Sequence, residues 1–183
     1  MSYYPDGDAD KKPIVERLRA RFPELALSVS DHRGDLCVRV ARETLLEVLR
    51  FLRHDPENDF DFLIDLCGVD WLGRDPRFDV VYHLYSLSRK HRLRVTAGVP
   101  EEDPVLDSAT AIWKGANWFE RECYDLVGIL FRGHPNLRRL LTHDDFRGHP
   151  LRKDYDQRQR WRCSTVSDLE SFRAEVPPAP EKA

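Results

Sequence analysis

The chain has 183 residues, of which 41% are hydrophobic and 33% are charged. This length fits one domain with a polar tail, and the charged fraction exceeds the roughly one quarter of an ordinary domain. A net charge of −3 argues against nucleic-acid binding by overall charge, and no apolar run approaches the roughly 20 residues of a membrane-spanning helix.

The first part of the chain predicts a helix, a hairpin and a second helix. We expect residues 1–12 to be flexible, because residues 1–10 are acidic and polar and lack the apolar stretch of a secretory signal. Pro13 suits the first turn of a helix that Pro23 ends. Alternating apolar residues over 25–41, with turn residues between them, predict a β-hairpin, and leucines and valines at helical spacing over 45–52 predict the second helix.

Three strands and a third helix should follow. Apolar residues within 59–71, 78–85 and 92–97, joined by short connections, predict strands that pair in antiparallel fashion. Ser108 can cap a helix that begins near Ala109 and ends at Gly128. Residues 13–131 should therefore form an α+β domain in which helices pack on one face of a mostly antiparallel sheet.

Periodicity ends after Phe131. Two Gly-His-Pro triplets, at 133–135 and 148–150, are typical of loops. Residues 132–162 contain nine Lys/Arg and four Asp/Glu, an excess of five positive charges. We expect this stretch to be an extended C-terminal arm that binds a partner and is ordered only there. Residues 163–183 should be a polar tail, disordered or ordered by a partner.

Groups that could carry chemistry are sparse. The chain has no glycine-rich phosphate loop, and its four cysteines lack the close pairs typical of zinc and iron–sulfur sites. His134, His143 and His149, with aspartates nearby, form the best candidate metal site, on which a metal hydrolase could be built. They lack ligand spacing such as HxxxH, so contacts to backbone or to a partner are the alternative.

Charged residues crowd the predicted third helix. Glu120, Glu122 and Asp125 could act as paired carboxylates in acid–base chemistry. However, Arg121 and Asp125 have the i, i+4 spacing of an ion pair on a solvated helix surface. We therefore expect ion pairs at the surface or at an interface.

Aromatic residues offer two further hypotheses. Trp113 and Trp118 would point about 140° apart on a helix, so one of them should face a partner. Phe146, Tyr155 and Trp161 accompany the basic residues of the arm. They could stack on single-stranded nucleic acid or anchor the arm on a protein.

One ordered series of residues is more specific than these patterns. It begins with Ala-Asn-Trp-Phe-Glu-Arg-Glu-Cys-Tyr-Asp-Leu-Val-Gly-Ile-Leu-Phe at 116–131 and continues with Gly-His-Pro at 133–135 and Gly-His-Pro-Leu-Arg-Lys-Asp-Tyr at 148–155. This series resembles the signature of the C subunit of NADH:quinone oxidoreductase, respiratory complex I. Two departures, Phe146 for a more usual tryptophan and Leu126-Val127 for a more usual Met-Phe pair, keep apolar bulk.

The resemblance implies a cofactor-free scaffold subunit in the peripheral arm of the complex, at the cytoplasmic face of the bacterial inner membrane. Its partners would be chiefly the D subunit and also the B and I subunits, with FMN and the iron–sulfur clusters in partner subunits. We expect no catalytic, cofactor or metal residue on this chain, no nucleic acid, and membrane association only through the complex. The residues expected to bind partners are Trp118, Glu120, Arg121, Glu122, Asp125, His134, Pro135, Arg139, His149, Pro150, Arg152, Lys153, Asp154 and Tyr155.

Two alternatives of different kinds stay open. The same scaffold would serve as the equivalent subunit of a membrane-bound hydrogenase or of a ferredoxin- or F420-linked complex. A nucleic-acid-binding module using the basic arm would instead bind with an affinity that falls steeply with salt.

Overall fold

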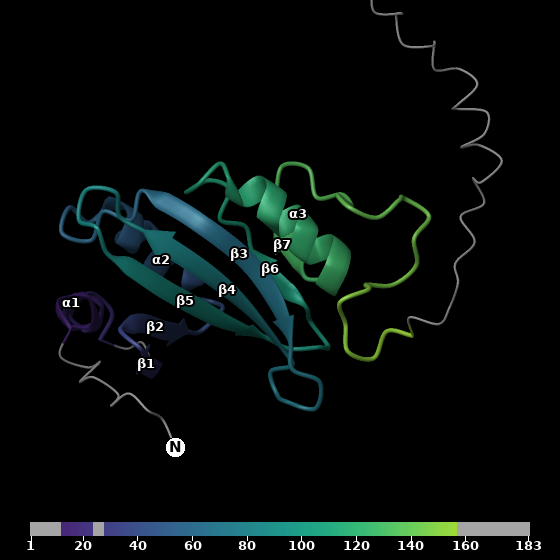
Figure 1. The fold of residues 1–183 in the computed structure, drawn as a ribbon, viewed down its shortest axis with the longest axis horizontal. Coiled ribbons are helices and arrows are strands. Elements are labelled where there is room, and N and C mark those ends of the chain that lie inside the picture. Colours follow the sequence, from purple (N-terminus) through teal and green to yellow (C-terminus); the bar gives the residue numbers. More distant parts are fainter. Residues whose placement is uncertain (1–11, 24–27, 157–183) are drawn as a thin grey trace, which may run out of the picture.

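Helices and strands combine in an α+β fold, as predicted (Figure 1). The computed structural model describes residues 12–23 and 28–156. The elements in chain order are α1 (Pro13–Arg21), β1 (Ser28–His32), β2 (Asp35–Val40), α2 (Leu45–His54), β3 (Phe62–Asp70), β4 (Phe78–Tyr85), β5 (Arg92–Val99), β6 (Val105–Asp107), α3 (Ala116–Val127) and β7 (Leu130–Arg132). Within the described ranges, every helix is too short or too polar to cross a lipid bilayer.

The main sheet has five strands in the order β1-β2-β5-β4-β3. β2 and β5 run parallel, whereas the other three neighbouring pairs are antiparallel, which confirms the mostly antiparallel sheet. A parallel pair needs a long connection, and the chain from α2 to β4 supplies it. A separate parallel pair joins β6 to β7.

A register shift in β3 changes which of its side chains point outward. The irregularity lies between Leu63 and Asp65 where β3 pairs with β4. Leu63 and Leu66 are buried as a result, whereas Phe62 is 50% exposed and Ile64 is 40% exposed. A bulge of this kind re-aims side chains locally, and here it leaves apolar residues at an edge of the sheet.

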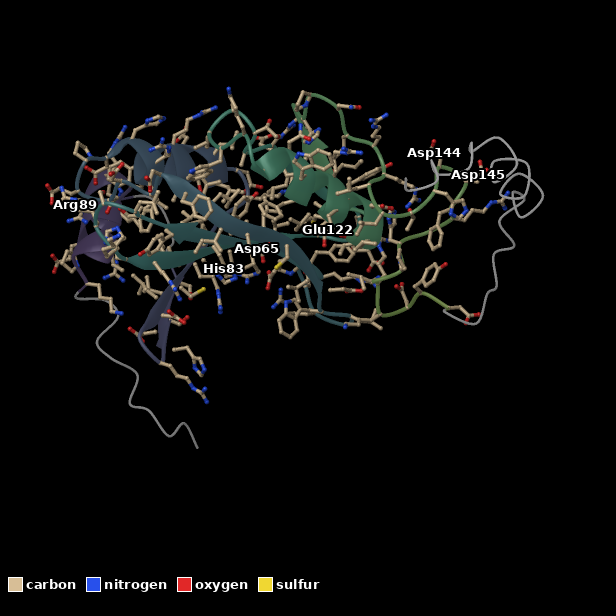
Figure 2. All side chains as sticks on the ribbon, turned by 45° about the horizontal axis from the view of Figure 1, so that its top comes forward. Asp65, His83, Arg89, Glu122, Asp144 and Asp145 are labelled. Carbon is tan, nitrogen blue, oxygen red and sulfur yellow. The ribbon has the colours of Figure 1, made fainter. Side chains whose placement is uncertain are left out.

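All three helices contribute to one core on one side of the main sheet. Leu18 of α1, Leu49 of α2 and Cys123 of α3 belong to the same buried cluster as Tyr82 of β4. Gly68 of β3 permits the close approach of α3, because a Cβ there would lie 2.7 Å from the Cys123 sulfur. Figure 2 shows α3 above the sheet, with the side chains of Asp65 and His83 projecting below it.

The third helix begins later than predicted. α3 starts at Ala116, after Gly115, and residues 110–112 and 114–115 form turns instead. The hydroxyl of Ser108 does not cap a helix, because it donates to the buried carboxylate of Glu120 at 2.6 Å. Trp113 enters the core and donates its indole N–H to the Phe60 carbonyl at 3.2 Å.

Four predictions lie wholly or partly outside the described residues. They concern the flexible N-terminus apart from Lys12, residues 25–27 of the hairpin, residues 157–162 of the arm, which include Trp161, and the polar tail at 163–183.

Candidate partner interface

Asp125, near the end of α3, connects this helix to residues 133–156, which we call the C-terminal segment. Its Oδ2 accepts hydrogen bonds from the backbone N–H groups of Leu140, Leu141 and Thr142 at 3.0, 2.7 and 2.9 Å. Its Oδ1 accepts from Arg139 at 2.8 Å and from the Thr142 hydroxyl. Burial alone would raise the pKa of this carboxyl, but the donors outweigh it and hold the pKa well below its usual range.

The C-terminal segment also donates hydrogen bonds to the backbone carbonyls at the end of α3. The last helical carbonyls, at 125–127, accept hydrogen bonds from Nδ1 of His149 at 2.9 Å, the backbone N–H of Leu151 at 2.9 Å and Nε of Arg152 at 2.6 Å. Carbonyls at a helix end have no partner within the helix, so the segment acts as its cap. Gly128, at φ +87°, leaves room for it, because a Cβ there would lie 2.5 Å from the His149 ring.

A second set of contacts holds the same segment against the end of β3 and the start of β4. Arg77 donates to both oxygens of Asp70 at 2.8 and 2.7 Å and to both oxygens of Asp154 at 3.1 and 2.7 Å. It also contacts Glu101 at 2.6 Å, while Asp70 accepts from the backbone N–H of Lys153 at 2.8 Å. These carboxylates raise the pKa of Arg77 above its already high value, so the buried guanidinium stays charged.

The predicted surface ion pair between Arg121 and Asp125 was wrong. Arg121 is 8% exposed and donates to the backbone carbonyls of Arg138 and Arg139 at 3.1 and 3.0 Å. Asp125 is engaged by the C-terminal segment instead. The Arg121 guanidinium lies 5.2 Å from the ring centre of Trp118, which is 61% exposed. Of the two tryptophans predicted to diverge, Trp118 is therefore the one that faces outward.

Glu120 is likewise not a surface residue. Its carboxylate is fully buried and accepts hydrogen bonds from the Ser108 hydroxyl and the Ala109 backbone N–H, both at 2.6 Å. Burial outweighs these two hydrogen bonds and raises the pKa of Glu120 to about 7. Glu120 therefore links the chain after β6 to α3 and can hold a proton near neutral pH.

The remaining predicted residues line the C-terminal segment and α3. The Nε2–H group of His134 donates a hydrogen bond to the Asn117 carbonyl at 3.1 Å. Tyr155 stacks on Phe146 with ring centres 6.0 Å apart. The exposed members of the predicted set are Trp118, Glu122, Pro135, Lys153 and Asp154. Glu120 and Asp125 are enclosed by their own chain, so partner contact stays a prediction for the accessible residues alone.

The structure does not bring His134, His143 and His149 together. His134 and His149 bind backbone carbonyls, and the ring of His143 packs edge-on against Phe146, with ring centres 5.6 Å apart. Over residues 12–23 and 28–156, no three His, Cys, Asp or Glu side chains are grouped to hold a metal ion.

The path of the C-terminal segment bears on the predicted arm. Over 133–156 the segment has no helix or strand, and its contacts with Asp125 and Arg77 hold it against its own domain. Ordering of the arm by a partner stays a prediction. Arg77, Asp70 and Thr142 were not among the predicted site residues. No local pattern could reveal the pair of Arg77 with Asp154, because the two residues are 77 positions apart.

Comparison with protein families gives a match over most of the chain. The family described as respiratory-chain NADH dehydrogenase, 30 Kd subunit, matches residues 38–160. The C subunit of NADH-quinone oxidoreductase from Roseiflexus sp. (strain RS-1) is 52% identical over 145 residues, which are 79% of this chain and 83% of that protein. The protein of the same name from Citrifermentans bemidjiense is 50% identical over 147 residues, 80% of this chain and 90% of that one.

Two solved structures are similar to this chain. A trypsin-resistant fragment (1-134) of Nqo5 has 40% identity and a TM-score of 0.57, and the match covers 68% of this chain and 99% of the fragment. A chain of the membrane-bound sulfane sulfur reductase, an archaeal respiratory membrane complex, has a TM-score of 0.66 over 93% of this chain and 96% of that one. At 21% identity, the second likeness shows a shared fold only.

Proposed function

Because the chain belongs to the family of respiratory-chain NADH dehydrogenase 30 Kd subunits, we propose that it is a scaffold subunit in the peripheral arm of a proton-translocating NADH:quinone oxidoreductase. In this proposal it packs against the D subunit, with the B and I subunits as further neighbours. FMN and the iron–sulfur clusters belong to partner subunits, and the chain supports electron transfer from NADH to quinone by holding the assembly together. It reaches the cytoplasmic face of the membrane only through the complex.

The observation that carries this proposal is the anchored C-terminal segment. Several of its polar groups are used inside the chain, where they cap α3 and surround Asp125. Two of its leucines point outward, since Leu141 is 63% exposed and Leu151 is 56% exposed, and the exposed Trp118 lies on the adjacent helix. Large apolar and aromatic side chains held on a rigid support are typical anchors of protein interfaces.

The charged residues of the C-terminal segment also support a scaffold role. The C-terminal segment pairs several of its charges within the chain, which fixes the direction in which residue 156 leaves the domain. Exposed cations such as Arg138 and Lys153 remain at the surface and could steer an acidic partner surface.

Co-purification tests the proposal. The tagged chain should bring down the other subunits of the complex from membranes. Arg121→Ala and Arg152→Ala should lower the yield of the assembled complex, because each removes contacts that position the C-terminal segment. The matched control is Arg89→Ala, which removes an exposed arginine at the other end of the domain (Figure 2).

Two results would count against a scaffold role. If the variant complexes held all subunits at normal ratios but had lost turnover, Arg121 and Arg152 would have to act in catalysis. If the co-purified subunits lacked a flavin-binding NADH-input subunit, the chain would belong to a hydrogenase-type or ferredoxin-linked complex instead.

A further inference from the structure

The face of the main sheet opposite the helices has an unusual composition. An antiparallel sheet with one face in water normally carries polar residues on that face. Here the outward positions of β3 and β4 include Phe62, Cys67, Val69 and Val81, and Cys67 lies directly opposite Val81 in the strand register. Phe62 is 50% exposed, and Trp71, just beyond β3, is 48% exposed. Exposed apolar surface of this kind often marks an interaction site.

A hollow of about 450 Å³ lies on this face and is lined by residues of all five strands of the main sheet. Two cross-strand rows run along its floor, as the pairing registers show. The first row is Arg39, Thr96, Val81 and Cys67, and the second is Cys37, Arg94, His83 and, at its outer end on β3, Asp65. The floor thus combines small and apolar side chains with two arginines and a histidine.

The charged side chains around the hollow are Arg39, Arg74 and Arg94 against Asp79 and Asp65, which leaves one positive charge, although the whole chain carries −3. Asp79 pairs with both Arg39 at 2.7 Å and Arg74 at 2.6 Å, which leaves one positive charge in that group. Arg94 has no ion pair with any residue in the described ranges. Burial and the neighbouring Arg94 lower the pKa of His83 and outweigh Asp65 and Asp35, which raise it, so the neutral form is favoured.

We propose that this hollow is a second docking surface of the chain, which binds an amphipathic segment of a neighbouring subunit. An apolar side chain of that segment would fill the floor beside Trp71, and a carboxylate would pair with Arg94. Arginine suits such a contact because its planar guanidinium can bind a carboxylate through two hydrogen bonds. This inference rests on the proposed function, because it needs a neighbouring subunit.

Two native thiols report directly on whether the hollow is covered. Cys37 and Cys67 are free, half-buried cysteines of its floor. In the isolated full chain, a water-soluble maleimide should alkylate both. In the purified complex, alkylation should be slower by roughly tenfold or more, as for a site closed by an interface. Equal rates in both states would overturn the proposal.

A charge reversal tests the chemistry of the occupant. Arg94→Glu should reduce incorporation of the chain into the complex by roughly tenfold or more, since it places like charges opposite each other. Arg89→Glu, the same change at the far end of the domain, should leave incorporation unchanged. The thermal transition of isolated Arg94→Glu should match that of the wild type, because the side chain is exposed. That of Arg89→Glu should fall only slightly, because its contacts with Pro56 and Glu57 lie at the surface.

Other outcomes would each contradict the inference in a recognisable way. Normal incorporation of Arg94→Glu would show that no carboxylate binds there. If Cys67 is already protected in the isolated chain and a truncation after Asp156 exposes it, the chain covers its own hollow. Protection that depends on the concentration of the isolated chain would indicate a second copy. If the wild-type chain joins no complex at all, the proposed function fails first.

Discussion

Replacing Asp125 by Asn should release the C-terminal segment while leaving the sheet intact. The aspartate carboxylate accepts three backbone N–H groups on one oxygen and two side-chain donors on the other. An asparagine of the same shape offers one oxygen and one N–H₂ group. The N–H₂ group would therefore face either the backbone N–H groups or the side-chain donors that now bind a carboxylate oxygen. It would also leave Arg139, whose side chain is only 15% exposed, without its counter-charge.

The expected cost is about 3 kcal/mol, the lower end of the range for breaking a buried ion pair. That free energy corresponds to a roughly 100-fold larger population of the detached segment. Cleavage by trypsin at Arg138 or Arg147 should accelerate by a similar factor, provided that the segment opens and closes faster than the protease cuts. Mass spectrometry of a digestion time course measures this rate for each site.

Asp144→Asn is the matched control, because it removes an exposed carboxylate from the same segment (Figure 2). Its cleavage rate should equal that of the wild type. The pKa of Asp125 lies below its ordinary value of 3.8, so the stability it contributes is complete above that pH and is lost only in stronger acid. A cleavage rate of Asp125→Asn within about twofold of the wild type at neutral pH would refute the anchoring role.

Two further predictions concern single residues of the same region. The folded-state pKa of Glu120, about 7, lies above its ordinary value of 4.5, so its contribution to stability should fall by about 3 kcal/mol as pH rises from about 4.5 to about 7. Glu120→Gln should abolish that loss in urea unfolding at pH 5 and pH 8, and an unchanged pH dependence would contradict the burial argument. Gly128→Ala should destabilise the chain by more than Gly133→Ala does, as judged by urea midpoints. Both glycines have positive φ, but only the Cβ at 128 would collide with His149 and Arg152. Equal effects would mean that the cap on α3 does not depend on this close contact.

Local patterns in the sequence were sufficient to predict most of the elements. Alternation over 25–41 and the turn residues within it predicted the β1–β2 hairpin, whose turn has positive φ at Arg33 and Gly34. Short connections predicted the antiparallel arrangement of β3, β4 and β5. Helical spacing predicted α2, and Gly128 was correctly expected to end α3. Each of these features depends on residues that are close in sequence, so backbone propensity and burial periodicity determine it.

The order of the same residues also carried the family resemblance, which the match over residues 38–160 confirmed. It could not say how the charges in that stretch are used. The spacing of Arg121 and Asp125 predicted a surface pair, yet the fold brings residues 138–142 against α3 and gives each charge a different partner. Likewise, the parallel pairing of β2 with β5 depends on where two distant strands lie.

The sequence by itself therefore determined the periodic elements, the turns and the family. Tertiary structure alone decided which charges are buried, which segments anchor one another and which face of the sheet stays open. The physical reason is that a carboxylate such as Asp125 or Asp154 takes whichever donors folding places within hydrogen-bonding distance. Those donors come from residues too far along the chain for spacing to predict.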